Sequence, residues 1–466
     1  MFPQENHSNG YQQGPGVGYS HRERVRRGTR RSRASTSSVR VYDQHQPQHR
    51  PPCTDFDVAY FHSYAHLGIH QEMIKDRVRT ETYRDAIMQH QSSIAGKVVV
   101  DVGCGTGILS IFCAQAGAKR VYAIDASDIA LQANEVVKAN NLSDVIVVLH
   151  GRVEVDSFDQ YMLFIFHRCY TLYHSYLVHG NLQKCNMWGL HGLGFSYHIG
   201  YYWLAFLVWS SKDVEIDEEV DVIISEWMGY MLLYESMLGS VINARDRWLK
   251  PGGLILPSSA TLYMAPVTHT DRYSDSVDFW RNVYGIDMSA MVSLAKQCAF
   301  EEPSVETITG ENVLTWPHVV KYIDSYSVTV QELESVTAKF KFNSMMRAPL
   351  HGFAFWFDVE FNGHAISSTN YQSTTSFVDN HQMNGSQRKR RTNPNEALVL
   401  STAPEDPPTH WQQTLIYFYD PIELEQDQLI EGSVTLSQSK ENARFMNIHL
   451  EYTSGGRSYV KESVMR

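Results

Sequence analysis

The stretch VVVDVGCGTG at residues 98–107 decides the fold class of this chain. Its first five residues form a short apolar run, interrupted only by Asp101, which is typical of a strand buried on both faces of a parallel sheet. Three alternate glycines follow, and a helix-like stretch runs from Leu109 to Ala116. Glycines at such a turn let a ligand approach the backbone and the N–H groups of the helix. The stretch therefore predicts a ligand-binding turn in an α/β domain.

The residues that follow continue this βαβ pattern. RVYAIDA at 120–126 predicts a second strand, Ile129 to Asn140 a second helix, and Val220 to Ile224 a further strand of the same parallel sheet. A dinucleotide fingerprint would place its third glycine at position 108, where Ile108 stands, so the loop favours an adenosyl-amino-acid ligand instead. The second strand ends at Asp125, which we expect to accept hydrogen bonds from two ribose hydroxyls. The alternative is a helix-capping Asp before Ser127.

Two carboxylates lie in one apolar segment, SEWMGYMLLYES at 225–236. Glu226 directly follows the strand at 220–224, at the edge where open α/β sheets bind ligands, and Glu235 comes nine residues later. Burying two acids is costly unless a cation neutralises them. A planar guanidinium can be held by two carboxylates at once, so the pair predicts an arginine site. The alternative is one acid in an internal salt bridge and the other facing solvent.

The chain changes character after Pro257. Apolar residues alternate with a period of two at Phe353, Phe355, Phe357, Val359 and Phe361, and again from Met446 to Tyr452. This half therefore predicts a mainly antiparallel β domain. A Ser/Thr/Asn/Gln-rich stretch at 363–396 predicts a long disordered loop within it.

Composition limits the classes of partner. The 466 residues are 43% apolar, which excludes global disorder, and carry a formal net charge of −11. Residues 1–52 are polar and basic and predict a disordered tail, whose run from Arg22 to Arg33 reads as a nuclear signal or as a solvated arm. The acidic remainder disfavours direct nucleic-acid binding and favours a cationic partner. Six Cys without a CxxC pair favour a reducing, intracellular compartment, and no secretory signal peptide is visible.

Five motifs together resemble the type I protein arginine N-methyltransferases, their plant-type members included. They are YFHSY (60–64), HQEM (70–73), DVGCGTG (101–107), SEWMGYMLLYES (225–236) and THW (409–411). The resemblance runs from residue 53 to the C-terminus, apart from two segments. It implies a Rossmann-like S-adenosylmethionine-dependent methyltransferase domain at 53–257. A β-barrel domain at 258–466 would follow, with a helical dimerisation arm at about 271–312.

The resemblance also assigns roles to single residues. S-adenosylmethionine would be bound by His70, Arg79, Gly103, Asp125 and Glu154, with Arg79 at its carboxylate and Glu154 at the adenine edge. Glu226 and Glu235 would clamp the substrate guanidinium, and His410 with Asp76 would help to remove a proton. Tyr64, Met73, Met237 and Trp411 would line the substrate pocket. By residue type alone, His70 and Arg79 fit a surface helix, His410 a solvated loop and the two methionines ordinary core packing. No metal site is predicted.

One segment departs from the family. Removing Val155 to Lys212 leaves a continuous family match, and these 58 residues contain 15 aromatic residues and no proline. Loops in compact domains are short and mostly polar, so we interpret the segment as the translation of a retained intron. A membrane hairpin around Leu193 to Trp209 is the alternative, but this run is shorter than the roughly 20 residues that a spanning helix needs. The scattered His and Cys lack the paired spacing of zinc ligands.

With the resemblance, these observations predict a homodimeric enzyme of the nucleus, with the cytoplasm as a second location. It would transfer methyl groups from S-adenosylmethionine to arginine in Arg-rich proteins such as histone tails, giving mono- and asymmetric dimethylarginine. The alternative is a catalytically impaired, adenosylmethionine-binding scaffold, because the insertion directly follows Glu154. A small-molecule methyltransferase is disfavoured by the paired carboxylates and the THW motif.

Overall fold

The computed structural model describes residues 55–154, 214–363 and 398–466, all of which belong to one unit, Arg50–Arg466. The predicted tail at 1–52, the insertion at 155–212 and all but Gly363 of the loop at 363–396 lie outside the described residues. Within the described ranges no helix has the length and apolar character needed to cross a membrane.

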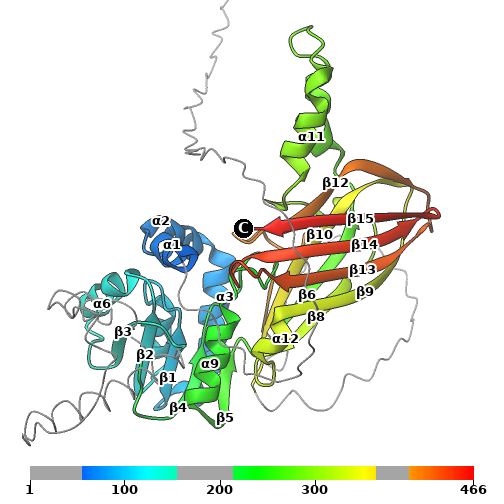
Figure 1. The fold of residues 1–466 in the computed structure, drawn as a ribbon. Coiled ribbons are helices and arrows are strands. Elements are labelled where there is room, and N and C mark those ends of the chain that lie inside the picture. Colours follow the sequence, from blue (N-terminus) through cyan, green and yellow to red (C-terminus); the bar gives the residue numbers. More distant parts are fainter. Residues whose placement is uncertain (1–54, 155–213, 364–397) are drawn as a thin grey trace, which may run out of the picture. The chain divides into compact units, whose positions relative to one another are not determined.

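A five-stranded parallel sheet forms the first half, in the order β3-β2-β1-β4-β5 (Figure 1). Its strands are β1 (Val98–Val102), β2 (Arg120–Asp125), β3 (Ile146–His150), β4 (Val220–Ile224) and β5 (Leu249–Leu256). All five residues of β1 are buried, as the apolar run predicted, because neighbours cover both faces. The predicted βαβ organisation is therefore confirmed.

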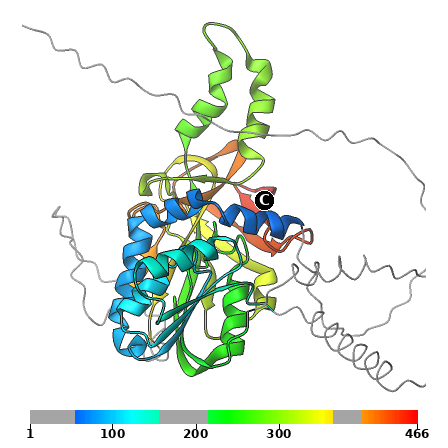
Figure 2. The same cartoon turned by 90° about the vertical axis from the view of Figure 1, so that its left-hand side faces the viewer.

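Seven helices accompany this sheet in the described ranges. They are α1 (Asp55–Tyr64), α2 (Leu67–Lys75), α3 (Arg77–Gln89), α4 (Gln91–Ile94), α5 (Ile108–Gln115), α6 (Ile129–Ala139) and α9 (Leu238–Trp248). In Figures 1 and 2, α1 and α2 lie over one edge of the sheet. The side chain of His70 in α2 contacts the glycine loop after β1, so this edge is the carboxyl edge of the strands.

The second half consists of two antiparallel sheets that curve into a barrel-like domain (Figure 1). One contains β6 (Ser259–Val267), β7 (Ser304–Glu306), β8 (His318–Asp324), β10 (Ala348–Phe361), β11 (Leu398–Ser401) and β12 (Gln413–Leu424). The other contains β9 (Ser335–Asn343), β13 (Leu429–Gln438), β14 (Met446–Ser454) and β15 (Arg457–Met465), in the order β15-β14-β13-β9. The predicted mainly antiparallel domain is confirmed.

Strand β10 is buried on both faces. The alternating apolar residues from Phe353 to Phe361 join the main core, which also contains Ile448 and Leu450 of β14. The opposite face, with Ala354 and Trp356, packs in a second cluster under helices that precede β7. The period-two pattern identified one core face, and these helices supply the cover for the other.

A helical segment connects β6 to β7 and projects from the barrel-like domain in both views (Figures 1 and 2). It contains α10 (Thr270–Ser276), η1 (Asp278–Arg281), η2 (Ser289–Met291) and α11 (Val292–Phe300). Its apolar side chains Phe279, Tyr284, Ile286 and Leu294 are exposed. Two short helices complete the described part of this half, η3 (Gly310–Asn312) and α12 (Val330–Glu334).

Backbone on either side of the insertion is directly connected. The Val214 amide donates to the Arg152 carbonyl over 2.9 Å. The Arg247 guanidinium, in α9, donates to the carbonyls of both Val153 and Val214. The last described residues before position 155 and the first described residues after position 213 are therefore neighbours in space.

Candidate active site

A pocket of about 370 Å³ opens at the carboxyl edge of the parallel sheet. All the predicted site residues except Asp76 line it. From the helices and the glycine loop come Tyr64, His70, Met73, Arg79 and Gly103, and from elsewhere Asp125, Glu154, Glu226, Glu235, Met237, His410 and Trp411. Residues far apart in the sequence thus meet where open α/β sheets bind ligands.

The glycine loop is closely packed. Gly103, Gly105 and Gly107 have φ values of 72°, 55° and 83°, a region that other residues rarely adopt. A Cβ atom at Gly103 would lie 2.0 Å from Cε of Met237, and one at Gly105 would lie 3.0 Å from Nδ1 of His70. Both positions therefore need glycine for two reasons, backbone conformation and space.

Asp125 connects this loop to the end of β2. Its Oδ2 accepts from the Gly105 amide at 2.8 Å, and its Oδ1 accepts from the amide and hydroxyl of Ser127 at 2.8 and 2.6 Å. The capping alternative is wrong, because the N-cap residue of α6 is Asp128. Asp125 is instead a half-buried carboxylate held at the pocket wall.

The buried acid Asp101, near the end of β1, connects the strand before the glycine loop to the helix after it. Asp101, at 0% exposure, accepts a 2.6 Å hydrogen bond from the Ser110 hydroxyl of α5. Burial raises its pKa to about 7, against the hydrogen bonds from Ser110. Asp101 therefore ties β1 to α5 across the glycine turn.

Glu226 is paired with Arg79. Oε2 of Glu226 accepts from Nη2 and Nε of Arg79 at 2.9 and 3.1 Å, and their side chains are only 8% and 7% exposed. The third described contact of this guanidinium is a 3.4 Å hydrogen bond to the Met73 carbonyl. The surface-helix interpretation of Arg79 and His70 is wrong, since both are buried.

Glu235 is half-buried among hydroxyls. Its Oε2 accepts from Tyr64 and Tyr60 at 2.7 and 3.0 Å. Burial raises the pKa of Glu235, and Glu226 adds to the rise, while the two tyrosines and the guanidinium of Arg444 oppose it. The alternative predicted one acid in an internal salt bridge, and Glu226 does form one with Arg79. It also predicted a solvent-facing second acid, which is wrong, because Glu235 is hydrogen bonded to two tyrosines.

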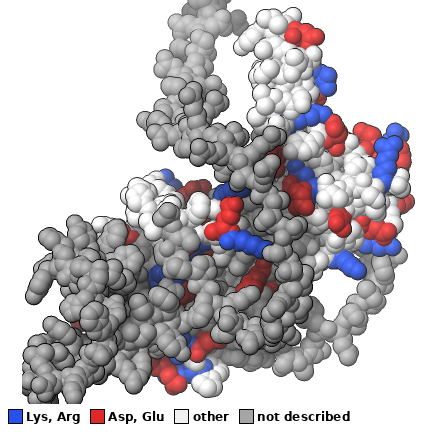
Figure 3. Space-filling view, in the orientation of Figure 1, with Lys and Arg blue, Asp and Glu red and all other residues white. Residues whose placement is uncertain are grey.

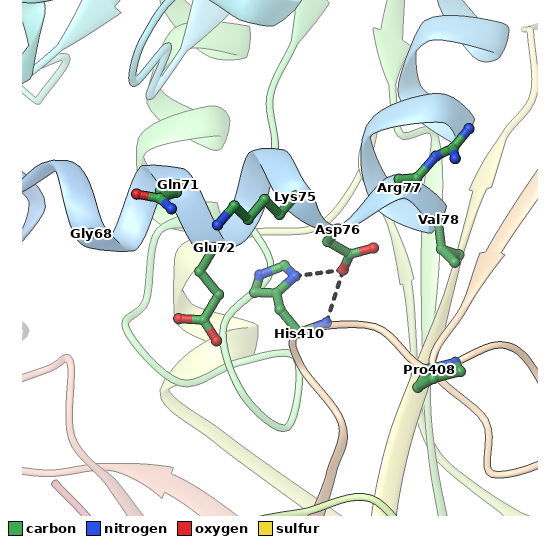
Figure 4. Close-up of a pocket in the computed structure, with 9 residues that line it drawn as sticks. All are labelled: Gly68, Gln71, Glu72, Lys75, Asp76, Arg77, Val78, Pro408 and His410. Atoms are coloured by element: carbon green, nitrogen blue, oxygen red, sulfur yellow. Dashed lines mark hydrogen bonds and ion pairs between the residues drawn. The ribbon is translucent and has the colours of Figure 1, made fainter. Parts of the chain in front are cut away.

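His410 of the THW motif lines this pocket and also a second, neighbouring pocket. The Asp76 carboxylate Oδ2 accepts from the His410 amide at 2.8 Å and lies 2.8 Å from His410 Nδ1 (Figure 4). Burial raises the pKa of Asp76, but hydrogen bonds from the His410 ring and from the Arg79 and His410 amides outweigh it, so the pKa is lowered. The neighbouring Trp411 ring donates to the Met228 carbonyl at 2.8 Å. His410 is thus a fixed residue and not a solvated one.

Figure 4 shows the second pocket, of about 690 Å³, beside this pair. Glu72 and Lys75 of α2 line it together with Asp76, Arg77 and His410. His410 and Glu72 also line the first pocket, so the two spaces meet at these residues.

The sequence did not indicate four residues that the structure adds to the site. Tyr60 bonds Glu235, Ser127 bonds Asp125, and the Ser240 hydroxyl donates to Glu154. Arg444 reaches the same pocket from the turn between β13 and β14. Tyr60 lies in the YFHSY motif, which could have signalled it, whereas nothing local distinguishes Arg444.

The surface of the barrel-like domain carries both signs of charge. Figure 3 shows basic and acidic side chains interspersed over it. One pair of opposite charges in this domain is Lys341 of β9 and Glu431 of β13, whose charged atoms lie 3.9 Å apart. This face therefore presents no block of positive charge over the described strands.

Comparison with known families divides the chain at the same place as the sheets. Residues 258–384 and 389–457 match the family model of the arginine methyltransferase oligomerization subdomain. Residues 85–163 match the model of the ribosomal protein L11 methyltransferase. Both matches concern methyltransferases, and the second spans the glycine loop and Asp125.

Similar structures share the whole architecture. The Trypanosoma brucei PRMT1 enzyme-prozyme heterotetrameric complex with AdoHcy matches 87% of this chain and 100% of its own, with TM-score 0.62 and 30% identity. Arabidopsis thaliana protein arginine methyltransferase 10 matches with the same coverage and TM-score at 28% identity.

Sequence relatives are closer still. The probable protein arginine N-methyltransferase 6 of Arabidopsis thaliana is 68% identical over 420 residues, which are 89% of this chain and 83% of the relative. Protein arginine N-methyltransferase 6 of Danio rerio is 37% identical, over 86% of this chain and 90% of its own. With a glycine loop, a held Asp125 and two glutamates around one pocket, and with these relatives, this chain belongs to the protein arginine N-methyltransferase family.

Proposed function

We propose that this chain is a type I protein arginine N-methyltransferase that makes mono- and asymmetric dimethylarginine in Arg-rich proteins such as histone tails. The observation that carries this proposal is the placement of a buried Glu226 side chain and a half-buried Glu235 in the pocket that also contains the glycine loop and Asp125. A carboxylate pair and a nucleoside site in one pocket fit a guanidinium acceptor and an S-adenosylmethionine donor.

The donor side has the chemistry that S-adenosylmethionine requires. Gly103 and Gly105 line the pocket and have no side chains, so a ligand can approach the backbone of the loop. Asp125 would hold the ribose hydroxyls, Glu154 the adenine edge, and Arg79 and His70 the amino-acid end. The bound donor would supply an electrophilic methyl group on sulfur.

The acceptor side would bind and orient a cation. A substrate guanidinium, with a pKa above about 12, arrives protonated. The two carboxylates would concentrate its charge on the nitrogens that they hold, which leaves electron density on the remaining nitrogen. Bond formation from this nitrogen to the methyl carbon would break the carbon–sulfur bond in line.

His410 would accept the proton that the methylated guanidinium releases. Its Nδ1 is engaged by Asp76 at 2.8 Å, so Nε2 is the nitrogen for this transfer. The lowered pKa of Asp76 keeps the carboxylate ionised, which would stabilise a protonated His410.

Several features support the finer proposals. Met73 and Met237 line the pocket, and their flexible thioethers could leave space for a second methyl group on one nitrogen. The acidic body would attract Arg-rich tails. The match to an oligomerization subdomain supports a homodimer, and the basic run from Arg22 to Arg33 supports a nuclear location.

The test compares the full chain with Glu226→Gln and with Glu423→Gln, an exposed acid of β12. Each protein is incubated with S-adenosylmethionine and a histone-tail peptide, and peptide mass and dimethylarginine symmetry are measured. We expect asymmetric dimethylarginine from the full chain and from E423Q. The rate of E226Q should fall by about 10²-fold or more, as when an oriented charged group is removed from an active site. Symmetric product would contradict the type I assignment, and equal rates for E226Q would contradict the clamp.

A further inference from the structure

The turn at residues 439–445, between β13 and β14, packs directly against the loop that carries Glu235. The Glu235 amide donates to the Arg444 carbonyl at 3.1 Å, and Nη1 of Arg444 donates back to the Glu235 carbonyl at 2.9 Å. The Ser236 hydroxyl donates to the Ala443 carbonyl. This turn of the barrel-like domain is therefore joined to the clamp by a reciprocal set of hydrogen bonds.

The same arginine side chain also holds α1. Nε of Arg444 donates to Oδ1 of Asp57 at 2.9 Å, and the guanidinium carbon lies 3.9 Å from the centroid of the Tyr60 ring. Next to it, the rings of Phe445 and Phe56 meet edge to face at 5.2 Å. Arg444 thus contacts the acid that would grip the substrate and the helix whose tyrosines bond that acid.

The clamp loop needs such support. Glu235 and Ser236 have φ values of 75° and 57°, in the left-handed region that is unfavourable for residues with a Cβ atom. Consecutive residues hold this conformation only when their surroundings impose it. The hydrogen bonds from Arg444 and Ala443 are contacts of this kind.

Helix α1 extends the connection to the donor side. The Tyr64 hydroxyl bonds Glu235, while the Tyr64 carbonyl lies 2.7 Å from Nε2 of His70 and accepts from the Ser127 hydroxyl at 3.4 Å. Ser127 in turn donates to Asp125. A chain of direct contacts therefore runs from Arg444 through α1 to the predicted ribose site.

We propose that Arg444 is a positioning residue that fixes the Glu235 loop and α1 to each other, so that the acceptor and donor sides of the pocket form together. This inference rests on the function proposed above. It goes beyond that function because it makes the affinity for the arginine peptide depend on whether the donor side is occupied. Arg444, a residue of the barrel-like domain, would transmit this dependence. A ligand on the donor side should strengthen peptide binding, and Arg444 should carry most of this effect.

The test uses the full chain with Arg444→Met, Arg444→Lys and the control Arg457→Met. Arg457 is exposed and is the first residue of β15, directly after the turn that connects β14 to β15. Calorimetry gives the dissociation constant of an Arg-rich peptide with and without S-adenosylhomocysteine, and kinetics give kcat and KM for the peptide. Because binding is measured without turnover, a failure of the proposed chemistry can be told from a failure of this inference.

We expect R444M to raise KM about tenfold, with a smaller change in kcat, and to remove the effect of S-adenosylhomocysteine on peptide affinity. R444K should recover part of both effects, since lysine keeps the charge but not the planar fork. The acid limb of kcat/KM should also move to higher pH in R444M, because the guanidinium of Arg444 lowers the pKa of Glu235. R457M should match the unsubstituted chain. Unchanged KM, coupling and acid limb in R444M would overturn the proposal, even if the variant unfolds more easily.

Discussion

Glu226 and Glu235 share one pocket but have opposite kinds of partner. Glu226 is bound to the Arg79 guanidinium, whereas Glu235 is bound to the neutral hydroxyls of Tyr60 and Tyr64. The Glu226 carboxylate is therefore paired directly with a cation, whereas the Glu235 carboxylate has only the Arg444 guanidinium nearby. An incoming guanidinium would gain most from Glu235, because a buried carboxylate without a directly paired cation is the costlier one to leave alone.

This difference predicts a pH effect of Tyr64→Phe. Glu235 must be ionised to hold a cation, so activity should fall as pH drops through its pKa, which burial has raised. The Tyr64 hydroxyl opposes that rise through its 2.7 Å hydrogen bond, so its removal should raise the pKa further. A hydrogen bond to a charged group is worth about 1.5–3 kcal/mol, so the acid limb of kcat/KM should move up by about one pH unit.

The measurement is kcat/KM between pH 5 and 9 for the full chain, Y64F and Y284F. Tyr284 is 99% exposed in the helical segment, so its variant should keep the original limb. A limb that stays in place in Y64F would show that ionisation of Glu235 does not limit activity at low pH.

Site residues could be predicted from the sequence only where a local motif contains them. Asp125 and Glu226 follow from their positions at strand ends, and Glu235 follows from its place in the same apolar segment as Glu226, which are local properties. The salt bridge from Arg79 to Glu226 and the contacts of Arg444 join residues more than a hundred positions apart. No pattern within a short window contains that information, so these partners required the structure.

Among the elements, those with continuous or strictly alternating apolar residues were predicted best. The strand predicted at 220–224 is β4, with the same bounds. Helix α1 shows no clear apolar face in its sequence, and its place is set by the turn at 439–445, which is itself polar and looks like an ordinary loop. Elements held mainly by distant partners were therefore the ones that periodicity could not place.

The end of α11 depends on one buried lysine. Nζ of Lys461, in β15, donates to the Phe300 carbonyl at 2.7 Å and lies 4.3 Å from the Tyr419 ring centroid. A cation at the carboxyl end of a helix satisfies a free carbonyl and is favoured by the helix dipole. Lys461 therefore fixes the helical segment to the barrel-like domain.

We expect Lys461→Met to lower the free energy of unfolding by about 1–3 kcal/mol, since the Phe300 carbonyl loses its donor in a buried place. Self-association should weaken as well if this segment is the dimerisation arm that the family resemblance implies at about 271–312. Urea unfolding and analytical ultracentrifugation measure the two effects. Lys440→Met, at an exposed position in the turn after β13, is the matched control, and equal stability of the two variants would contradict this role for Lys461.

In the molecule as a whole, the described backbone on the two sides of residues 155–213 is held together by hydrogen bonds. Arg152 and Val214 are hydrogen bonded, and Arg247 holds the backbone on both sides. Glu154, the last described residue before the insertion, still lines the pocket and accepts from Ser240. The described site is therefore complete without residues 155–212.

Deleting residues 155–212 should give a folded enzyme at least as active as the full chain. The cost of closing a loop changes by only about 0.6 kcal/mol for each doubling of its length, so a large change in stability is not expected. Methylation of the histone-tail peptide by both proteins, followed by mass spectrometry, checks this. Activity only in the shortened protein would identify the full chain as the impaired form, and inactivity of both would favour the scaffold alternative.

The bond between Arg152 and Val214 also has a consequence for how such a chain can acquire new parts. Because these two backbone positions are hydrogen bonded to each other, they form an insertion site that can accept a foreign sequence without moving either end. A reporter domain with closely spaced termini could be grafted there in place of residues 155–212. Glu154 lines the pocket and directly precedes this insertion site, so the signal of the reporter domain could respond to ligand binding in the pocket.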